Sequence, residues 1–341
     1  MSRTLTLLVG VAIAQSLLLV SAGAARRASA DGYAGAALGI GPGGTLWLAE
    51  ADRPYLARVD PSGRLHPVQL RVGYWFPVSI VTGPDGALWV ADQGAGTGNL
   101  LRYAPSGAGL PAAHLLPLGS TPNVVTVGPD HALWYTDRGL NAIGRMTTAG
   151  RVTMYPLPSK DAVPDYIAIG PDGALWFTEL KAGKIGRIDT RGRITERAAY
   201  VPRGQGVPAD ANGVYSAHPT GIVAGLDGNL WFTEQEGFLV RLSTAGRQTP
   251  YHLPASGLPS QIVVGADKAL WVANGVGGVA RADTSGRMTL FSAGANALVV
   301  AVAATSDGSV WFSDQEGGKN TLARIARGHV TAFPAPPPFT P

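Results

Sequence analysis

Short apolar runs alternate with tight polar turns along nearly the whole chain. The segment 165–196 shows the pattern once: an apolar run, a Gly-Pro-Asp-Gly turn and an aromatic run occupy 166–179, and two further apolar runs around an Arg-Gly turn occupy 184–196. Runs of this length, rich in β-branched and aromatic residues and bounded by Gly, Pro and Asp, are typical of strands joined in hairpins. The segment therefore predicts four consecutive antiparallel strands.

The same unit recurs seven times, and one tryptophan marks each copy. These residues are Trp47, Trp89, Trp134, Trp176, Trp231, Trp271 and Trp311. Neighbouring copies lie 40 to 45 residues apart, except for a gap of 55 between Trp176 and Trp231. A period of about 40 to 45 residues is that of a four-stranded propeller blade. We therefore predict an all-β fold, a seven-bladed β-propeller over residues 31–333 with every repeat tryptophan buried, followed by a Pro-rich tail at 334–341.

The first thirty residues differ from the rest of the chain. Arg3 gives a positive start, 5–20 is apolar, and small residues at 22–24 and 28–30 suit a cleavage site. This pattern is typical of a secretory signal peptide, so we expect residues 1–30 to be removed and the protein to be secreted or exported to the cell envelope. The apolar run also approaches the roughly 20 residues that span a bilayer, which leaves an uncleaved membrane anchor as the alternative.

Charge and composition limit the classes of partner. The chain has 341 residues, of which 15% are charged, and no cysteine. Cleavage after Ala30 removes Arg3, Arg26 and Arg27, and the remaining 24 basic and 23 acidic residues give a net charge of +1. This balance does not favour nucleic acid, and no disulfide stabilises the fold. We expect a monomer held by burial and ring closure, with a small-molecule or peptide ligand.

The blade pattern places two sets of residues at one mouth of the central channel. If each inner strand leads into its Asp-Gly turn on one face, the residues eleven before and three after each tryptophan converge on the opposite face. The residues three after are Glu50, Asp92, Asp137, Glu179, Glu234, Asn274 and Asp314. The residues eleven before are Ala36, Val78, Asn123, Asp165, Thr220, Ser260 and Val300. Polar members concentrate in units three to six, where we expect the functional site.

The repeated charges also have a structural interpretation. A carboxylate after a strand accepts backbone N–H groups of the following turn, and seven copies cannot all be catalytic. The third strand of every unit carries an arginine, which we expect to tie neighbouring blades together through a charge-assisted pair. These arginines are Arg58, Arg102, Arg145, Arg187, Arg241, Arg281 and Arg324.

Two interruptions of the repeat fall at the same mouth. An insertion at 200–218 has the length of a lid or binding loop, although an inert surface loop fits it equally well. Tyr74, Trp75 and Phe76 precede the second inner strand and offer flat apolar surface to a ring-bearing ligand, with packing on the neighbouring blade as the alternative. His218 is the one histidine of six that the register places near this mouth.

The strings GPDGALWFTE from Gly170 and LDGNLWFTE from Leu226, with IGRI from Ile185, resemble the virginiamycin B lyase (streptogramin lyase) family over residues 35–333. The resemblance implies a seven-bladed propeller whose enzymes open the lactone of streptogramin B antibiotics by elimination and need a magnesium ion. In that family, histidines at the start of certain inner strands work with glutamates of the Trp-Phe-Thr-Glu string. Those glutamates correspond here to Glu179 and Glu234.

The histidine positions of the family are not matched. They read Val78, Asn123, Asp165, Thr220 and Ser260 in this chain. Elimination needs a base to remove a proton beside a carbonyl and an acid to protonate the leaving oxygen. Asp165 needs a strongly raised pKa to act as that base, and His218 stands on the other side of Pro219. These two residues nevertheless complete the candidate catalytic set with Glu179 and Glu234.

The candidate metal ligands are Asp165, Glu179 and Glu234, with Mg²⁺ expected and Ca²⁺ as the alternative, because carboxylate oxygens suit hard cations. The candidate ligand contacts are Tyr74, Trp75, Phe76, Asn123, Thr220 and Ser260. Three functions stay open: a lyase acting on a lactone or cyclic depsipeptide, a non-catalytic secreted propeller that binds a ligand or protein, and a metal-dependent lactonase resembling the gluconolactonase propellers.

Overall fold

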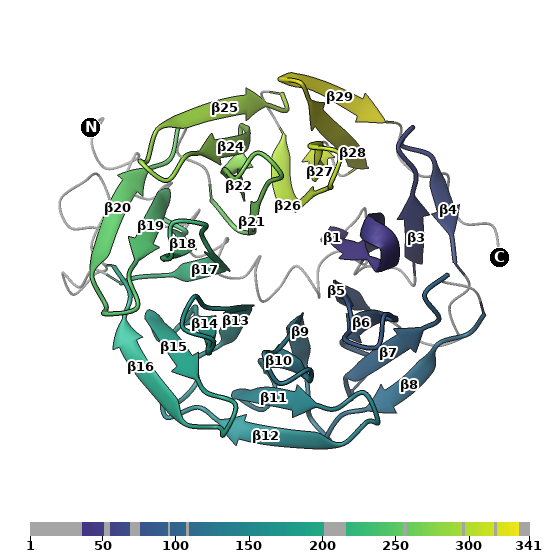
Figure 1. Ribbon diagram of the computed structural model, residues 1–341, viewed down its shortest axis with the longest axis vertical. Coiled ribbons are helices and arrows are strands. Elements are labelled where there is room, and N and C mark those ends of the chain that lie inside the picture. The colour runs from purple at the N-terminus through teal and green to yellow at the C-terminus, as the bar shows by residue number, and fades with distance from the viewer. Residues whose placement is uncertain are drawn as a thin grey trace, which may run out of the picture.

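The fold is a closed ring of seven β-sheets around a central channel (Figure 1). The computed structural model describes residues 36–50, 55–68, 76–94, 96–106, 109–200, 216–254, 258–294, 297–316 and 319–333. Each sheet has four antiparallel strands in sequence order, and one carries an additional short strand. The predicted seven-bladed, all-β propeller is confirmed. The predicted signal peptide and C-terminal tail lie outside the described residues.

The strands follow the blade period from the first blade to the last. Blades 1 and 2 comprise β1 (Ala36–Gly41), the 3-10 turn η1 (Pro42–Gly44), β2 (Thr45–Glu50), β3 (Tyr55–Val59), β4 (Leu65–Pro67), β5 (Pro77–Thr82), β6 (Leu88–Asp92), β7 (Asn99–Tyr103) and β8 (Ala112–Leu115). Blades 3 and 4 comprise β9 (Pro122–Val127), β10 (Leu133–Asp137), β11 (Ala142–Met146), β12 (Val152–Pro156), β13 (Pro164–Ile169), β14 (Leu175–Glu179), β15 (Lys184–Ile188) and β16 (Ile194–Ala198).

The last three blades repeat the arrangement with one addition. Blades 5 and 6 comprise β17 (Pro219–Ala224), β18 (Leu230–Glu234), β19 (Phe238–Leu242), β20 (Gln248–His252), β21 (Ile262–Val264), β22 (Leu270–Ala273), β24 (Gly278–Ala282) and β25 (Met288–Ser292). Blade 7 comprises β26 (Leu298–Ala304), β27 (Val310–Glu316), β28 (Lys319–Ala326) and β29 (His329–Phe333), and the short β23 (Gly275–Val276) joins it at β26. Within the described residues no helix is long and apolar enough to cross a membrane.

The repeat tryptophan fastens each blade to its own turn. All seven are buried, as predicted, with at most 6% of any of them exposed. In five blades the indole Nε1 donates to the aspartate of the Asp-Gly turn at 2.9 to 3.1 Å. These aspartates are Asp85, Asp130, Asp172, Asp227 and Asp267. The bond satisfies the one polar atom of a large buried ring and fixes the hairpin.

The third-strand arginines act mainly within a blade, which corrects the expectation that they join blades. Arg102, Arg145, Arg187 and Arg281 donate Nε–H to the second oxygen of the turn aspartate at 2.6 to 2.7 Å. The register explains this pairing, because each arginine lies directly opposite the tryptophan of the second strand. Arg324 does reach the next blade, donating to the Pro61 carbonyl at 2.6 Å.

The outer strands carry rings whose contacts repeat within and between blades. An outer-strand ring packs on the tryptophan of its own blade in the pairs Trp89–His114, Trp134–Tyr155, Trp231–Tyr251, Trp271–Phe291 and Trp311–Phe333, with ring centroids 5.2 to 5.6 Å apart. His114 also lies over Gly150 of the following blade, and three further rings cover a glycine of the following blade more closely, in the pairs Tyr155–Gly192, Tyr251–Gly286 and Phe333–Gly63. A Cβ atom at any of the three glycines would come within 2.1 Å of the ring. Glycine therefore permits the close approach.

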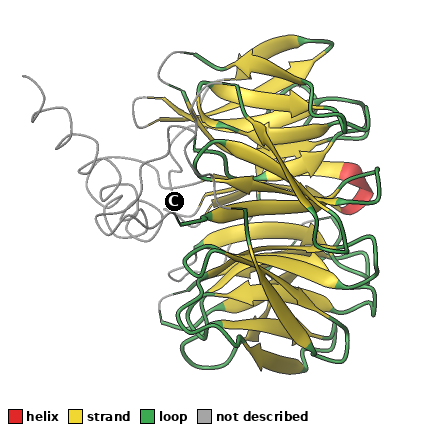
Figure 2. Ribbon diagram, turned by 90° about the vertical axis from the view of Figure 1, so that its left-hand side faces the viewer, coloured by secondary structure: helices red, strands yellow, loops and turns green. Residues whose placement is uncertain are grey.

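The two faces of the ring differ in what they carry. The Asp-Gly turns and η1 lie on the face toward the viewer of Figure 1, which is the right-hand side of Figure 2. The inner strands begin, and the second strands end, on the opposite face, because Pro77 pairs with Asp92, Pro164 with Glu179 and Pro219 with Glu234. We call the first the turn-bearing face and the second the acid-bearing face.

Candidate functional site

The side chains three after the tryptophans are buried at the acid-bearing face. At most 4% of each is exposed, and the set is Glu50, Asp92, Asp137, Glu179, Glu234, Asn274 and Asp314. Four of them accept a backbone N–H at 2.5 to 2.9 Å, in the pairs Phe76–Asp92, Thr121–Asp137, His218–Glu234 and Leu298–Asp314. These acids therefore support the backbone, but the shared donor precedes the inner strand and does not lie in the following turn, as the structural interpretation expected. Asp137 in addition accepts the N–H of Leu140 in the following turn at 3.0 Å.

Glu179 departs from this pattern. Its side chain is fully buried, yet neither carboxylate oxygen has a hydrogen-bond partner among the described residues. The residue that corresponds to the donor in the other blades is Val163, whose φ is +54°. A β-branched residue rarely adopts this left-handed conformation. The unusual backbone at Val163 thus accompanies the loss of the bond that holds the equivalent carboxylates.

Three polar residues, Ser159, Lys184 and Glu196, lie near Glu179. Glu196 accepts bonds from the backbone and the hydroxyl of Ser159 at 2.9 and 2.6 Å, and Lys184 donates to Glu196 at 2.9 Å. Burial, and then the nearby Glu196 carboxylate, raise the pKa of Glu179 to about 7, against a smaller lowering effect of the Lys184 charge. A carboxyl group with this pKa changes its protonation near neutral pH, as a general acid or base does.

Glu234 lies in the corresponding place in blade 5. It is fully buried, and burial, followed by the charge of Glu236, raises its pKa well above the usual range. Oε2 accepts the backbone N–H of His218 at 2.8 Å, and Oε1 has no partner among the described residues. The His218 ring bonds through Nδ1 to Glu236 at 2.5 Å. The structure thus joins His218 to Glu234 and adds Glu236, which the sequence analysis missed because it lies outside the repeat.

Asp165 is already paired. Its carboxylate bonds to Arg138 and accepts the Asn123 side-chain amide at 2.7 Å, and only 6% of its side chain is exposed. Its backbone carbonyl also accepts bonds from Asn123 and from Thr136 of blade 3. Two of the predicted site residues, Asn123 and Asp165, therefore lie together, but as a polar link between blades 3 and 4. The sequence analysis had no signal for Arg138, which also lies outside the repeat.

Thr220 and Ser260 form similar links further around the ring. The Thr220 hydroxyl is within 2.7 Å of the Thr233 hydroxyl and donates to the Pro259 carbonyl at 2.9 Å. Ser260 Oγ donates to the Val300 carbonyl at 3.1 Å. Both predicted ligand contacts thus use their hydroxyls to bridge neighbouring blades.

The predicted aromatic contact surface is only partly described. Phe76 is partly buried, and its backbone N–H donates to Asp92. Tyr74, Trp75 and residues 201–215 of the insertion lie outside the described residues.

The magnesium site that the family resemblance implies is not assembled from the predicted ligands. Among the described residues, no three histidine or acidic side chains come close enough together to hold a metal ion. Asp165 is neutralised by Arg138, and the raised pKa of Glu234 favours its protonated form, which is a poor metal ligand. The residues present therefore do not fit a carboxylate-bound Mg²⁺ on Asp165, Glu179 and Glu234.

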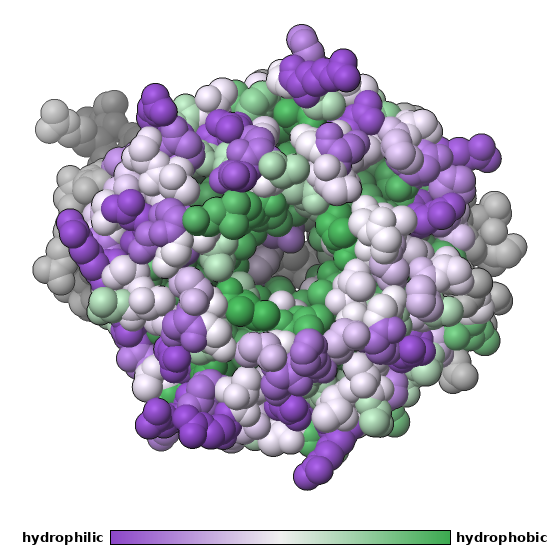
Figure 3. Space-filling view, in the orientation of Figure 1, coloured by the Kyte–Doolittle hydropathy of each residue, from purple (hydrophilic) through white to green (hydrophobic). Residues whose placement is uncertain are grey.

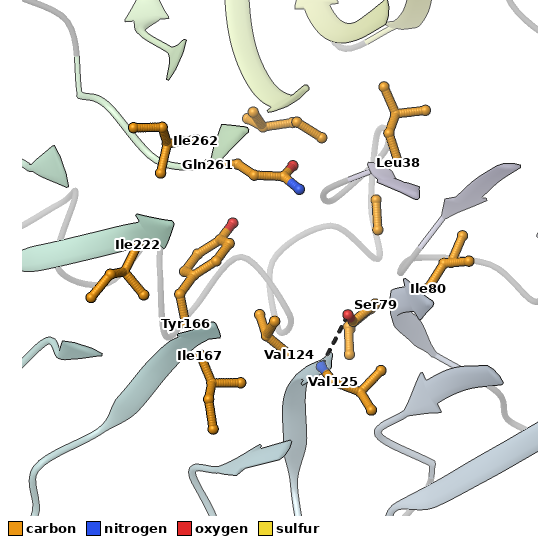
Figure 4. A pocket seen from close by; sticks show the side chains of 14 residues that line it. Leu38, Ser79, Ile80, Val124, Val125, Tyr166, Ile167, Ile222, Gln261 and Ile262 are labelled. Atoms are coloured by element: carbon orange, nitrogen blue, oxygen red, sulfur yellow. Dashed lines mark hydrogen bonds between the residues drawn. The ribbon is translucent and has the colours of Figure 1, made fainter. Parts of the chain in front are cut away.

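The channel itself contains a second feature that the sequence analysis did not identify. A cavity of about 220 Å³ runs between the inner strands, and its walls are mostly alanine, valine, leucine and isoleucine. Tyr166 and Gln261 direct their polar ends into this space (Figure 4). Tyr166 follows Asp165 and Gln261 follows Ser260, and the blade pattern placed both preceding residues at the mouth. The same pattern shifted by one residue therefore locates Tyr166 and Gln261.

Comparison with known proteins agrees with this architecture. The model of the virginiamycin B lyase family matches residues 25–206 and 208–340. The virginiamycin B lyase from Staphylococcus aureus is 26% identical, with a TM-score of 0.69 over 83% of this chain and 91% of that one. A catalytically inactive histidine-to-alanine variant of that lyase with quinupristin is also 26% identical, with a TM-score of 0.70 over 83% and 92% of the two chains.

A putative gluconolactonase shares the fold at 16% identity and a TM-score of 0.50, over 72% of this chain and 92% of that one. None of the curated proteins compared with the chain matches it. The family match covers nearly the whole propeller and agrees with its blade count and its Trp-Phe-Thr-Glu strings. This chain therefore belongs to the virginiamycin B lyase family.

Proposed function

We propose that this protein is a ligand-binding propeller of the virginiamycin B lyase family that does not open streptogramin B antibiotics. One observation carries the proposal: Asn123, Asp165, Thr220 and Ser260, which stand where the family resemblance implies histidines, have side chains committed to hydrogen bonds between blades. None of these four side chains carries a basic nitrogen, and their hydrogen bonds hold them between the blades. The open channel remains, which supports binding.

The chemistry of ring opening supports the same conclusion. The reaction needs a base that accepts a proton near neutral pH, and a missing general base typically costs about 10²- to 10⁴-fold in rate. The S. aureus relative loses its activity when one histidine becomes alanine, as the description of the inactive variant states. Asp165 is a weak substitute, because its carboxylate is already bonded to Arg138 and to the side-chain amide of Asn123. Magnesium forms no part of the proposal, since the predicted ligands do not fit it.

Reintroducing the family's histidines tests the proposal. We expect the double variant Asp165→His, Thr220→His to remain unable to open quinupristin, because the introduced histidines supply a base, but no three histidine or acidic side chains among the described residues come together to hold the metal that the family resemblance implies. The single variant Thr220→His, which leaves the Arg138 pair intact, controls for loss of folding, and thermal unfolding confirms that both variants are folded. Turnover that appears in either variant would contradict the proposal, since it would mean that the rest of a lyase site is in place.

A second candidate function rests on His218. Glu236 bonds to Nδ1 of the imidazole, and such a bond leaves Nε2 as the nitrogen that accepts a proton. Burial, and then the charge of Glu236, raise the pKa of the neighbouring Glu234 carboxyl, which favours the protonated form that a general acid needs. Together they would supply acid–base chemistry from a position different from that of the family histidines. The predicted export and monomeric state apply to either candidate.

A further inference from the structure

We infer that the central channel, entered from the turn-bearing face, binds a neutral, mainly hydrocarbon molecule whose carbonyl oxygen accepts hydrogen bonds from Tyr166 and Gln261. This inference rests on the proposed binding function and names the chemistry of the ligand and the face that it enters.

The channel walls favour an uncharged ligand. Residues from all seven inner strands line the cavity, and branched aliphatic side chains such as Leu38, Ile80, Ile167, Ile222 and Ile262 predominate. None of the lining residues is acidic or basic. A charged ligand would lose its hydration there without gaining a countercharge, which is costly. An apolar ligand instead gains by leaving water.

Two side chains provide a specific polar anchor. Gln261 Oε1 accepts the backbone N–H of Val302 at 3.1 Å, which directs the amide nitrogen toward the channel. The Tyr166 hydroxyl has no hydrogen-bond partner among the described residues, and Figure 4 shows it pointing into the same space as Gln261. Burial, and then the Asp165 charge, raise the pKa of Tyr166, so the phenol keeps its proton. Both groups are therefore donors, and a carbonyl oxygen satisfies both.

The entrance has a matching character. Hydrophobic residues gather around the opening on the turn-bearing face (Figure 3). Ile169 and Leu226 belong to this end of blades 4 and 5 and are 37% and 65% exposed. Leu226 stands where the turns at 83–86, 128–131 and 170–173 have proline. An exposed apolar rim around a cavity is a common mark of a ligand site.

The cavity volume limits the size of the ligand. An apolar cavity of about 150 Å³ accommodates benzene, so about 220 Å³ suits a compact molecule of about ten non-hydrogen atoms. A bicyclic ketone has this size and carries one carbonyl oxygen. We therefore choose 1-tetralone as the probe, and tetralin, which has the same skeleton without oxygen, as the matched control.

Calorimetric titration of the full propeller with both probes tests the inference. We expect 1-tetralone to bind with a Kd of about 0.1 to 1 mM, and about fivefold more tightly than tetralin because of the hydrogen bonds. Tyr166→Phe should remove this preference and leave tetralin binding unchanged. Tyr135→Phe is the control, because the Tyr135 hydroxyl bonds to Met154 inside blade 3, away from the channel. Val124→Phe, which fills the cavity, should abolish binding of both probes.

Three outcomes would overturn the inference: no binding of 1-tetralone, equal affinity in wild type and Tyr166→Phe, or binding that survives Val124→Phe. A charged probe of the same size, 1-naphthoate, should bind at least tenfold more weakly than 1-tetralone, and equal affinity would contradict the neutral-ligand assignment. These results are separate from the proposed function. Opening of quinupristin by the wild type would overturn that function, whereas a protein that neither opens quinupristin nor binds 1-tetralone overturns this inference alone.

Discussion

Glu179 and Glu234 end the same Leu-Trp-Phe-Thr-Glu strand in neighbouring blades, and one difference between their surroundings is a backbone hydrogen bond. Glu234 accepts the N–H of His218, whereas the corresponding residue before β13, Val163, has a left-handed backbone and Glu179 accepts no described bond. A buried carboxyl without a donor favours its neutral form. Burial raises the pKa of both carboxyls, and the backbone bond that Glu179 lacks is associated with the conformation of Val163 and not with the motif.

The raised pKa of Glu179 predicts a specific pH dependence of stability. Between its ordinary pKa of 4.5 and the folded-state value of about 7, the folded state holds a proton that the unfolded state has released. The free energy of unfolding should therefore fall as the pH rises through this window and stay lower above it. Glu179→Gln removes this contribution, so the variant should be more stable than wild type at pH 8, by at most about 3 kcal/mol. Denaturant unfolding from pH 4 to pH 8 measures both, and parallel curves for the two proteins would show that Glu179 titrates normally.

At the scale of elements, each blade is a hairpin fastened at one tryptophan and then stacked on its neighbour. In blade 3, for example, the turn aspartate Asp130 joins the Trp134 indole to Arg145 of the third strand, and the ring of Tyr155 in the outer strand packs on the same tryptophan. Closure of the ring depends on the same contact between the last blade and the first, because among the described residues no strand is exchanged between these two blades.

Two phenylalanines allow the stabilisation from packing on a tryptophan to be measured apart from the stabilisation from closing the propeller ring. Phe333 packs on Trp311 and covers Gly63 of blade 1, whereas Phe291 packs equally closely on Trp271 and covers no glycine of blade 7. Phe333→Ala should therefore lower the free energy of unfolding by about 1 kcal/mol more than Phe291→Ala, because it also leaves a gap at the closing interface. It should also increase amide exchange in β1 to β4. Equal losses in the two variants would indicate that closure does not depend on this ring.

The elements were predictable from the sequence to a greater extent than the site was. The seven tryptophans and their turns define the blades, because a period of this kind reflects local strand and turn preferences. The roles of Asp165 and of the arginines were not predictable, since they depend on which residue of another strand lies within bonding distance. Arg138, Glu196 and Glu236 lie outside the repeat pattern, so no period marked them. The positive φ of Val163 likewise has no counterpart in the hydrophobic pattern.

At the scale of the whole molecule, the two faces of the ring have separate characters. The acid-bearing face holds buried carboxyls that mostly support the backbone, and the turn-bearing face opens into an uncharged channel. The family's lyase chemistry would require free histidines and a metal at the acid-bearing face. The structure has instead a cavity with hydrogen-bond donors in the channel between the two faces. This distribution explains how a member of a lyase family keeps its fold while its inner-strand residues serve to join blades.

The most direct test of this account is incubation of the purified wild type with quinupristin and Mg²⁺, followed by liquid chromatography and mass spectrometry, with the S. aureus lyase as positive control. Elimination gives a product of unchanged mass at a new retention time, and hydrolysis adds the mass of one water. We predict that the antibiotic is recovered intact under conditions in which the control consumes it completely. Consumption by the wild type at a comparable rate would contradict the account, and loss of that activity in His218→Gln would identify His218 as the base.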